Sequence, residues 1–121
     1  MNSLAGKSVV IVEDHSLIAA FLKMTCEAFE VEVRGETDRA EEAVSLVAQA
    51  RPSHVVLDIR LTGEMDGVDA ARLLNINFPE VRIIFVTGST EQSMLERMKN
   101  VEHHKILEKP VNPEALFKAL L

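Results

Sequence analysis

The sequence contains a single cysteine and no long hydrophobic run. Because Cys26 has no partner in the chain, an intramolecular disulfide is excluded. It lies among Phe21, Leu22 and Phe29, where a small buried side chain would fit, so we expect it in the core. No apolar stretch approaches the ~20 residues of a membrane span, and the first residues lack the cleavage site of a signal peptide. These absences favour a cytoplasmic protein without contact to a membrane.

Basic residues are also scarce, with 13 Lys and Arg against 19 Asp and Glu and a formal net charge of -6. Direct binding of nucleic acid needs a clustered basic face, and the basic residues of this chain are scattered, so we expect none. The excess of acid leaves room for a divalent cation where several carboxylates converge. Since 121 residues with 47% hydrophobic content suit one globular core, residues 1–121 are interpreted as a single domain.

Strands and helical patterns alternate along the chain. Short apolar runs at 9–12, 55–57, 83–86 and 106–107 predict buried strands, because near-continuous β-branched runs are typical of parallel strands covered on both faces. Residues 31–33 alternate, as in an exposed edge strand. The order is β-α repeated five times, which predicts an α/β fold with a parallel sheet and helices on both faces.

Amphipathic patterns and capping residues mark the helices between these strands. The first helix is predicted from a stripe of apolar residues at three- and four-residue spacing: Leu17, Ile18, Phe21, Leu22, Cys26 and Phe29. Helix starts are predicted at four capping positions: Asp38 with Glu41, Asp66, Ser89 with Gln92, and Asn112 before Pro113.

Polar side chains follow four of the five predicted strands. Glu13 and Asp14 follow the first, Asp58 the third, Thr87 the fourth and Lys109 the fifth. In an open parallel sheet, ligands bind outside the carboxyl ends of the strands, so we expect these side chains at one edge. Three close carboxylates repel one another unless a cation or protons neutralise them, and Mg2+ prefers such oxygen ligands. A carboxylate in this setting can also act as a phosphoryl nucleophile.

Four motifs in this order, IVEDH, VVLDIRL, FVTGS and LEKPV, resemble the signature of response-regulator receiver domains over essentially the whole chain. The resemblance implies that Asp58 is the phosphoacceptor. It implies direct Mg2+ ligation by Asp14, Asp58 and the Arg60 backbone carbonyl, with Glu13 assisting through water. It further implies a flavodoxin-like sheet of order 2-1-3-4-5 and a cis bond between Lys109 and Pro110.

The same resemblance implies that Thr87 and Lys109 contact the phosphoryl group, which comes from a histidine kinase or a histidine phosphotransfer protein. Phosphorylation would change the conformation, with Thr87 and position 106 in the switch, and so control a partner or output domain. The output surface would comprise the fourth helix, fifth strand and fifth helix, with these apolar candidates: Met94, Leu95, Met98, Ile106 and Phe117. Such a protein is a signalling domain that catalyses only its own phosphorylation and dephosphorylation, and either a monomer or a homodimer would fit.

Three features depart from the family pattern. Ile106 occupies a position that is commonly aromatic, three residues before the lysine, so signal transmission must use another element. The loop 61–67 lacks the usual proline and is one residue longer, which Gly63 can accommodate with a positive φ. Arg60 stands two residues after Asp58, where we expect its side chain to alter the lifetime of the phosphoryl group.

Alternative functions compete with this interpretation. The missing aromatic residue and altered loop would suit a receiver-like adaptor that works without phosphorylation, although all five chemical positions are filled. A Mg2+-dependent phosphatase with an aspartyl nucleophile fits less well, because the chain lacks residues for a substrate cap. In a flavodoxin-like cofactor carrier Glu13 and Asp14 would repel the phosphate. A zinc site is not expected either, because His103 and His104 lack metal-ligand spacing with any partner on the same face. His15 and His54 are predicted in a loop or at a strand edge.

Overall fold

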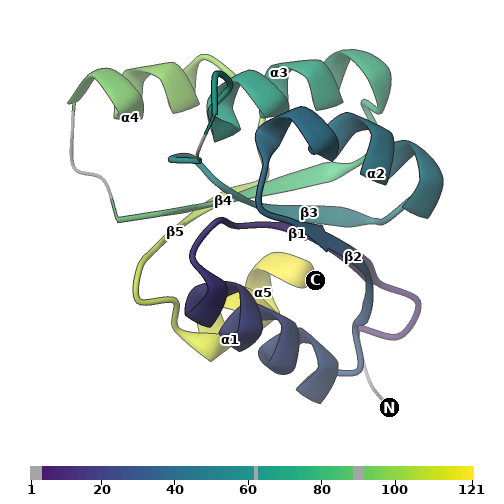
Figure 1. Ribbon diagram of the computed structural model, residues 1–121. Coiled ribbons are helices and arrows are strands. Elements are labelled where there is room, and N and C mark those ends of the chain that lie inside the picture. Colours follow the sequence, from purple (N-terminus) through teal and green to yellow (C-terminus); the bar gives the residue numbers. More distant parts are fainter. Residues whose placement is uncertain (1–3, 62, 89–91) are drawn as a thin grey trace.

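The protein is described by a computed structural model covering residues 4–61, 63–88 and 92–121 (Figure 1). Five strands form one parallel sheet: β1 (Ser8–Val12), β2 (Glu32–Thr37), β3 (His54–Asp58), β4 (Arg82–Thr87) and β5 (Lys105–Glu108). Their order is β2-β1-β3-β4-β5. The predicted α/β, flavodoxin-like arrangement is therefore confirmed.

Helices cover both faces of the sheet. They are α1 (Ser16–Ala28), α2 (Ala43–Ala50), α3 (Gly67–Asn77), α4 (Gln92–Lys99) and α5 (Pro113–Leu120), with a short 3-10 turn η1 (Ala40–Glu42) before α2. Figure 1 shows α1 and α5 on one face, and α2, α3 and α4 on the other. No helix in the described ranges has the length and apolar character needed to cross a membrane.

The sheet separates two hydrophobic cores. Val10, Leu57 and Phe85 belong to the core under α2, α3 and α4, whereas Ile11 and Val56 belong to the core under α1 and α5. Because both faces are covered, every residue of β1 and β3 is buried, as their continuous apolar runs predict. The edge strand β2 alternates between exposed and partly buried residues and extends farther than predicted, to Thr37.

The stripe predicted for α1 is correct at four of its six positions. Ile18 and Phe29 are partly buried and pack against the core under α1 and α5. Leu22 and Cys26 are buried, and burial raises the pKa of the Cys26 thiol to about 12, as expected of an inert core residue. Leu17 and Phe21, however, are 75% and 41% exposed and lie on the solvent side with Met24, which is 69% exposed. A helix can turn only one face to the core, so the predicted stripe was too wide.

Two of the predicted caps are confirmed at helices on opposite faces. Asp66 accepts a hydrogen bond from the Asp69 amide at 3.0 Å, and Asp69 accepts one from the Asp66 amide at 3.1 Å, so the pair forms a capping box at α3. The Asn112 side chain accepts hydrogen bonds from two amides at the start of α5, where Pro113 occupies the first turn.

The cap predicted at Asp38 is wrong. The segment begins as η1 after Arg39, without a side-chain cap, and α2 follows Glu42, again without one. Glu41 is engaged with a different part of the chain, described below, and so does not form the predicted capping box. The cap predicted at Ser89 lies outside the described residues.

Candidate functional site

The carboxyl ends of the central strands bring buried polar side chains to one edge of the sheet. Glu13 follows β1, Asp58 ends β3 and Thr87 ends β4, with exposures of 3%, 4% and 3%. Asp14 is exposed at the same edge. Glu13, Asp14 and Asp58 each present an oxygen atom, and these atoms lie within 4.8 Å of one another. The three carboxylates predicted to converge therefore lie together.

Lys109 joins this group from the segment after β5. Its amide donates to the Thr87 carbonyl at 2.9 Å, which aligns the segment with the end of β4. The bond to Pro110 is cis, as the resemblance implied. The Lys109 ammonium lies 3.0 Å from Glu13 Oε1 and 3.3 Å from Asp58 Oδ2. One ammonium group thus bridges the two buried carboxylates.

The surroundings of Asp58 favour its protonated form. Burial and the adjacent Glu13 carboxyl outweigh the opposing effect of Lys109, and together they raise the pKa of Asp58 to about 7. Although burial opposes it, the contacts with Glu13 and Asp58 raise the pKa of Lys109. The Lys109 ammonium thus contacts two buried carboxylates, and a third carboxylate, that of Asp14, lies at the same edge.

A hard divalent cation suits this set of donors. All three side chains offer carboxylate oxygen, and the raised pKa of Asp58 reflects burial and repulsion that a bound cation would offset. Within the described ranges no histidine or cysteine belongs to the group, so its chemistry favours Mg2+ or Ca2+ over a metal that prefers nitrogen or sulfur.

The backbone after Asp58 turns tightly back onto the end of β3. The Arg60 amide donates to Asp58 Oδ1 at 3.2 Å, while the Arg60 side chain is exposed. The Gly67 amide donates to the Ile59 carbonyl at 2.9 Å. A side chain on Gly67 would overlap the backbone carbonyl oxygen of Asp58, so only glycine allows this approach. The first turn of α3 therefore lies directly against Asp58.

Glu41 holds the loop between Asp58 and α3, a role that the sequence did not indicate. Its Oε1 accepts hydrogen bonds from the amides of Glu64 at 3.1 Å and Met65 at 3.2 Å. Backbone hydrogen bonds, from its own amide and from Met65, lower the pKa of Glu41. Gly63 has the predicted positive φ, 110°, and lies against this carboxylate. The neighbouring Thr62 lies outside the described residues.

Arg97 links α4 to the same loop from the other side. Its Nη1 lies 2.6 Å from Asp66 Oδ2, and its Nη2 lies 3.3 Å from Asp66 Oδ1 and 3.1 Å from Asp69 Oδ1. Nothing in the local sequence indicates this contact, because Asp66 and Asp69 lie 31 and 28 residues from Arg97. All three charged residues would also fit ordinary surface positions.

The candidates for an output surface differ in accessibility. Met98 is completely buried and is therefore a core residue. Met94, Leu95 and Phe117 are partly buried and pack against the two cores. Ile106 is 38% exposed and pairs in register with Phe85 of β4, which places it on the face that carries α4.

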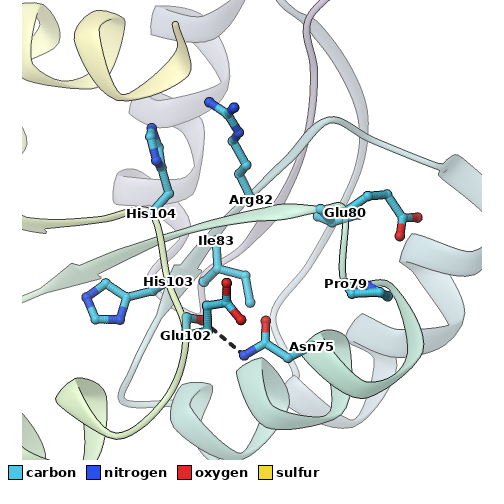
Figure 2. A pocket seen from close by; sticks show the side chains of 9 residues that line it. Asn75, Pro79, Glu80, Arg82, Ile83, Glu102, His103 and His104 are labelled. Carbon is cyan, nitrogen blue, oxygen red and sulfur yellow. Dashed lines mark hydrogen bonds between the residues drawn. The ribbon is translucent and has the colours of Figure 1, made fainter.

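A cavity lies at the opposite, amino edge of the sheet. Figure 2 shows its lining, in which Arg82 and His104 extend in the same direction and Asn75 donates to the Glu102 carbonyl at 3.0 Å. The ring of His104 lies 6.1 Å from that of His54, between centroids. His54 begins β3, and its side chain is 1% exposed, a degree of burial that the sequence did not indicate.

Known proteins resemble the chain over most of its length. The family model of the response regulator receiver domain matches residues 9–121. The chain is 30% identical to the chemotaxis protein CheY of Thermotoga maritima over 115 residues, which cover 95% of each protein. It is 24% identical to the response regulator GacA of Pseudomonas aeruginosa over 93% of its own length and 52% of that protein, so it spans about half of this relative.

Solved structures agree with this match. The signal receiver domain of a modulated diguanylate cyclase from Desulfovibrio desulfuricans G20 superposes with a TM-score of 0.88 and 36% identity, covering 93% of this chain and 89% of that one. A CheY-like response regulator receiver domain protein from Methanospirillum hungatei gives 0.84 and 25%, covering 93% and 88%. The chain therefore belongs to the response regulator receiver domain family of two-component systems.

Proposed function

We propose that the chain is the phosphoacceptor of a two-component phosphorelay and that Asp58 takes the phosphoryl group. The observation that supports this most directly is the position of Asp58. It is a buried carboxylate at a strand end, 3.3 Å from the Lys109 ammonium and within reach of two further carboxylates. A charged oxygen nucleophile beside an ammonium and a cation-binding group is the arrangement that phosphoryl transfer needs.

The donor set suits Mg2+, with Asp14, Asp58 and the backbone carbonyl of Arg60 as direct ligands and Glu13 acting through water. When bound, Mg2+ would neutralise charge on the carboxylates and on the transferring phosphoryl group. The His15 amide already donates to Glu13 Oε2 at 3.1 Å, which orients that carboxylate before any cation arrives.

The reaction uses the residues of the cluster in distinct roles. An ionised oxygen of Asp58 attacks the phosphorus of a phosphohistidine, so that a P–O bond forms as the P–N bond breaks and the donor imidazole leaves. Lys109 neutralises charge on the phosphoryl oxygens, and the Thr87 hydroxyl donates a hydrogen bond to one of them. Attack by water later returns the Asp58 carboxylate and releases inorganic phosphate.

The partners follow from the same proposal. The donor is a histidine kinase or a histidine phosphotransfer protein, and residues 1–121 act as one receiver domain in the cytoplasm. Thr87 and Ile106 lie in the part that changes on phosphorylation, and the surface formed by α4, β5 and α5 controls a downstream protein or domain. The domain is a signalling element and not an enzyme for a separate substrate.

Incubation with acetyl phosphate and Mg2+, followed by intact mass measurement and peptide mapping, tests the proposal. We expect the mass of one phosphoryl group on the wild type, located at Asp58, and none on Asp58→Asn. Asp38→Asn is a matched control, because Asp38 is exposed and lies outside the cluster. A wild type that gains no phosphoryl group and binds no beryllofluoride would contradict the proposal and favour the adaptor. Turnover of a generic phosphate ester would instead favour the phosphatase.

A further inference from the structure

We propose that the ion pair between Arg97 and Asp66 couples α4 to the chemical state of Asp58, in place of the aromatic residue that position 106 lacks. This inference rests on the proposed phosphoryl acceptance by Asp58. The pair holds α4 in the position that it has without a phosphoryl group, and phosphorylation releases it. Arg97 is thus a positioning residue for the output surface.

The first support is the geometry of the contact. The Arg97 guanidinium uses both terminal nitrogens on the Asp66 carboxylate, at 2.6 and 3.3 Å, and one of them also contacts Asp69 at 3.1 Å. Although burial opposes it, hydrogen bonds from Arg97 and Asp69 hold the pKa of Asp66 below its ordinary value. A planar guanidinium engaged by two carboxylates fixes the direction as well as the distance between α4 and α3.

The second support is the short path from Asp66 to Asp58. Gly67, the residue after Asp66, packs against the Asp58 carbonyl and donates to the Ile59 carbonyl at 2.9 Å. The capping box binds the Asp66 backbone and side chain to the first turn of α3. Because these contacts join the Asp58 backbone directly to Gly67 and Asp66, a shift at the end of β3 would move the Asp66 carboxylate.

The third support is the weak attachment of α4 to the rest of the fold. This helix has eight residues, of which Met98 alone is fully buried. A helix of eight residues is marginal on its own, so its position depends on its tertiary contacts. Arg97 also contacts Met94 Sδ at 3.5 Å, which connects the ion pair to the apolar side of the helix. Loss of the ion pair therefore removes the directional contact from a helix otherwise positioned by the packing of Met94, Leu95 and Met98.

Linkage makes the proposal measurable before any partner is known. If phosphorylation and the ion pair oppose each other, phosphorylation weakens the ion pair by some factor. Breaking the pair must then strengthen binding of a phosphoryl mimic by that same factor. Arg97→Gln removes the guanidinium, and Asp66→Asn removes the carboxylate charge but keeps a residue that caps helices well. Arg72→Gln is the matched control, since it removes the same charge from an exposed position on α3.

The experiment measures beryllofluoride affinity in the presence of Mg2+, together with amide hydrogen exchange of residues 92–99 in the free proteins. We expect Arg97→Gln and Asp66→Asn each to bind beryllofluoride about threefold more tightly, a size typical of a partly exposed ion pair. The double variant should bind no more tightly than either single one. Residues 92–99 of the free variants should exchange as fast as those of the beryllofluoride-bound wild type, and Arg72→Gln should match the wild type.

Unchanged or weaker beryllofluoride binding by Arg97→Gln and Asp66→Asn, with normal binding by the wild type, would overturn the coupling and leave phosphoryl acceptance intact. A wild type that fails to bind beryllofluoride would overturn both. Arg97→Lys keeps the charge without the fork, so affinity above that of the wild type supports the bidentate geometry, whereas affinity equal to that of the wild type contradicts it.

Discussion

Strand β3 carries a buried titratable side chain at each end, His54 at its amino end and Asp58 at its carboxyl end. Both are nearly inaccessible, with exposures of 1% and 4%. Burial disfavours the charged form of each and is the largest cause of two opposite shifts, since the pKa of His54 is lowered to about 4 and that of Asp58 is raised to about 7. The two ends share the same physical penalty but differ in their neighbours.

The neighbours of Asp58 can compensate its charge, whereas those of His54 cannot. Asp58 has the Lys109 ammonium at 3.3 Å and carboxylates able to share a cation. His54 has the Ser53 hydroxyl at 2.8 Å from Nδ1, but its Nε2 has no hydrogen-bond partner among the described residues. The positive charges of Lys7, His104 and Arg82 contribute, after burial, to the lowering of its pKa. A buried ionisable group is therefore a functional candidate only where its surroundings can accept its charge.

The largest effect that we expect is the loss of phosphorylation, which should follow a substitution at the carboxyl end of β3 but not one at its amino end. Asp58→Asn should abolish phosphorylation by acetyl phosphate, because an amide is not a phosphoryl nucleophile of this kind. His54→Gln should be phosphorylated to the same extent as the wild type, because it lies at the other end of β3 from the cluster. Intact mass spectra of both variants make the comparison, and a phosphoryl adduct on Asp58→Asn would show that another residue is the acceptor.

A second prediction concerns how tightly the carboxyl end is packed. Gly67→Ala should lower the free energy of unfolding by about 3 kcal/mol or more, because its side chain would collide with the Asp58 backbone and displace α3. Gly88→Ala is the control at the same edge, since among the described residues a side chain there would meet Lys109 alone, at 3.9 Å. Urea unfolding curves measure both changes. Equal stability of the two variants would mean that the first turn of α3 is not held against Asp58.

A third prediction concerns the pH dependence of stability that His54 causes at the amino end of β3. His54 is neutral in the folded protein between pH 6.5 and about 4, whereas the unfolded chain binds a proton below pH 6.5. Stability attributable to His54 should therefore be complete above pH 6.5 and fall by about 3 kcal/mol as the pH drops to 4. The difference in unfolding free energy between wild type and His54→Gln measures it. His15→Gln removes an imidazole from an exposed position and is the matched control.

Much of the fold could be predicted from the sequence because it depends on local pattern. Continuous apolar runs identify β1 and β3, since a strand covered on both faces has no solvent-exposed positions to alternate with its apolar ones. Asp66 and Asn112 could be assigned as caps because a cap acts on amides two or three residues away. Convergence of Glu13, Asp14 and Asp58 follows from the parallel sheet itself, which collects all strand ends of one kind at one edge.

The remaining features depend on contacts between distant segments. Glu41 has the spacing of a capping residue but accepts hydrogen bonds from Glu64 and Met65, more than twenty residues away, because η1 turns it toward that loop. Arg97 carries no signal that selects Asp66 over other acids. The outward orientation of Leu17 could not be predicted either, since two apolar stripes overlap on α1 and only packing decides which one is buried.

The smallest effect that we expect is on the unfolding free energy and arises from Asp58, at the carboxyl end of β3. Its dependence on pH has the opposite sign to that of His54. Because the folded-state pKa of Asp58 lies above its ordinary value, the group is least destabilising when protonated, below pH 3.8, and its penalty grows as the pH rises to about 7. In buffer with a chelator, Asp58→Asn should therefore be more stable than the wild type above pH 7, by about 1 kcal/mol once the lost contact with Lys109 is included. The difference in stability should close as the pH falls toward 4. It should reverse when Mg2+ is added, because a cation that binds the folded state stabilises the wild type.

Thermal unfolding with and without Mg2+ measures both shifts. If Asp58→Asn were less stable than the wild type in the chelator, the Lys109 ammonium alone would already compensate the charge of Asp58. The two ends of β3 would then differ because Asp58 has an ion-pair partner and His54 has none in the described part of the chain, and not because the Asp58 end can bind a cation.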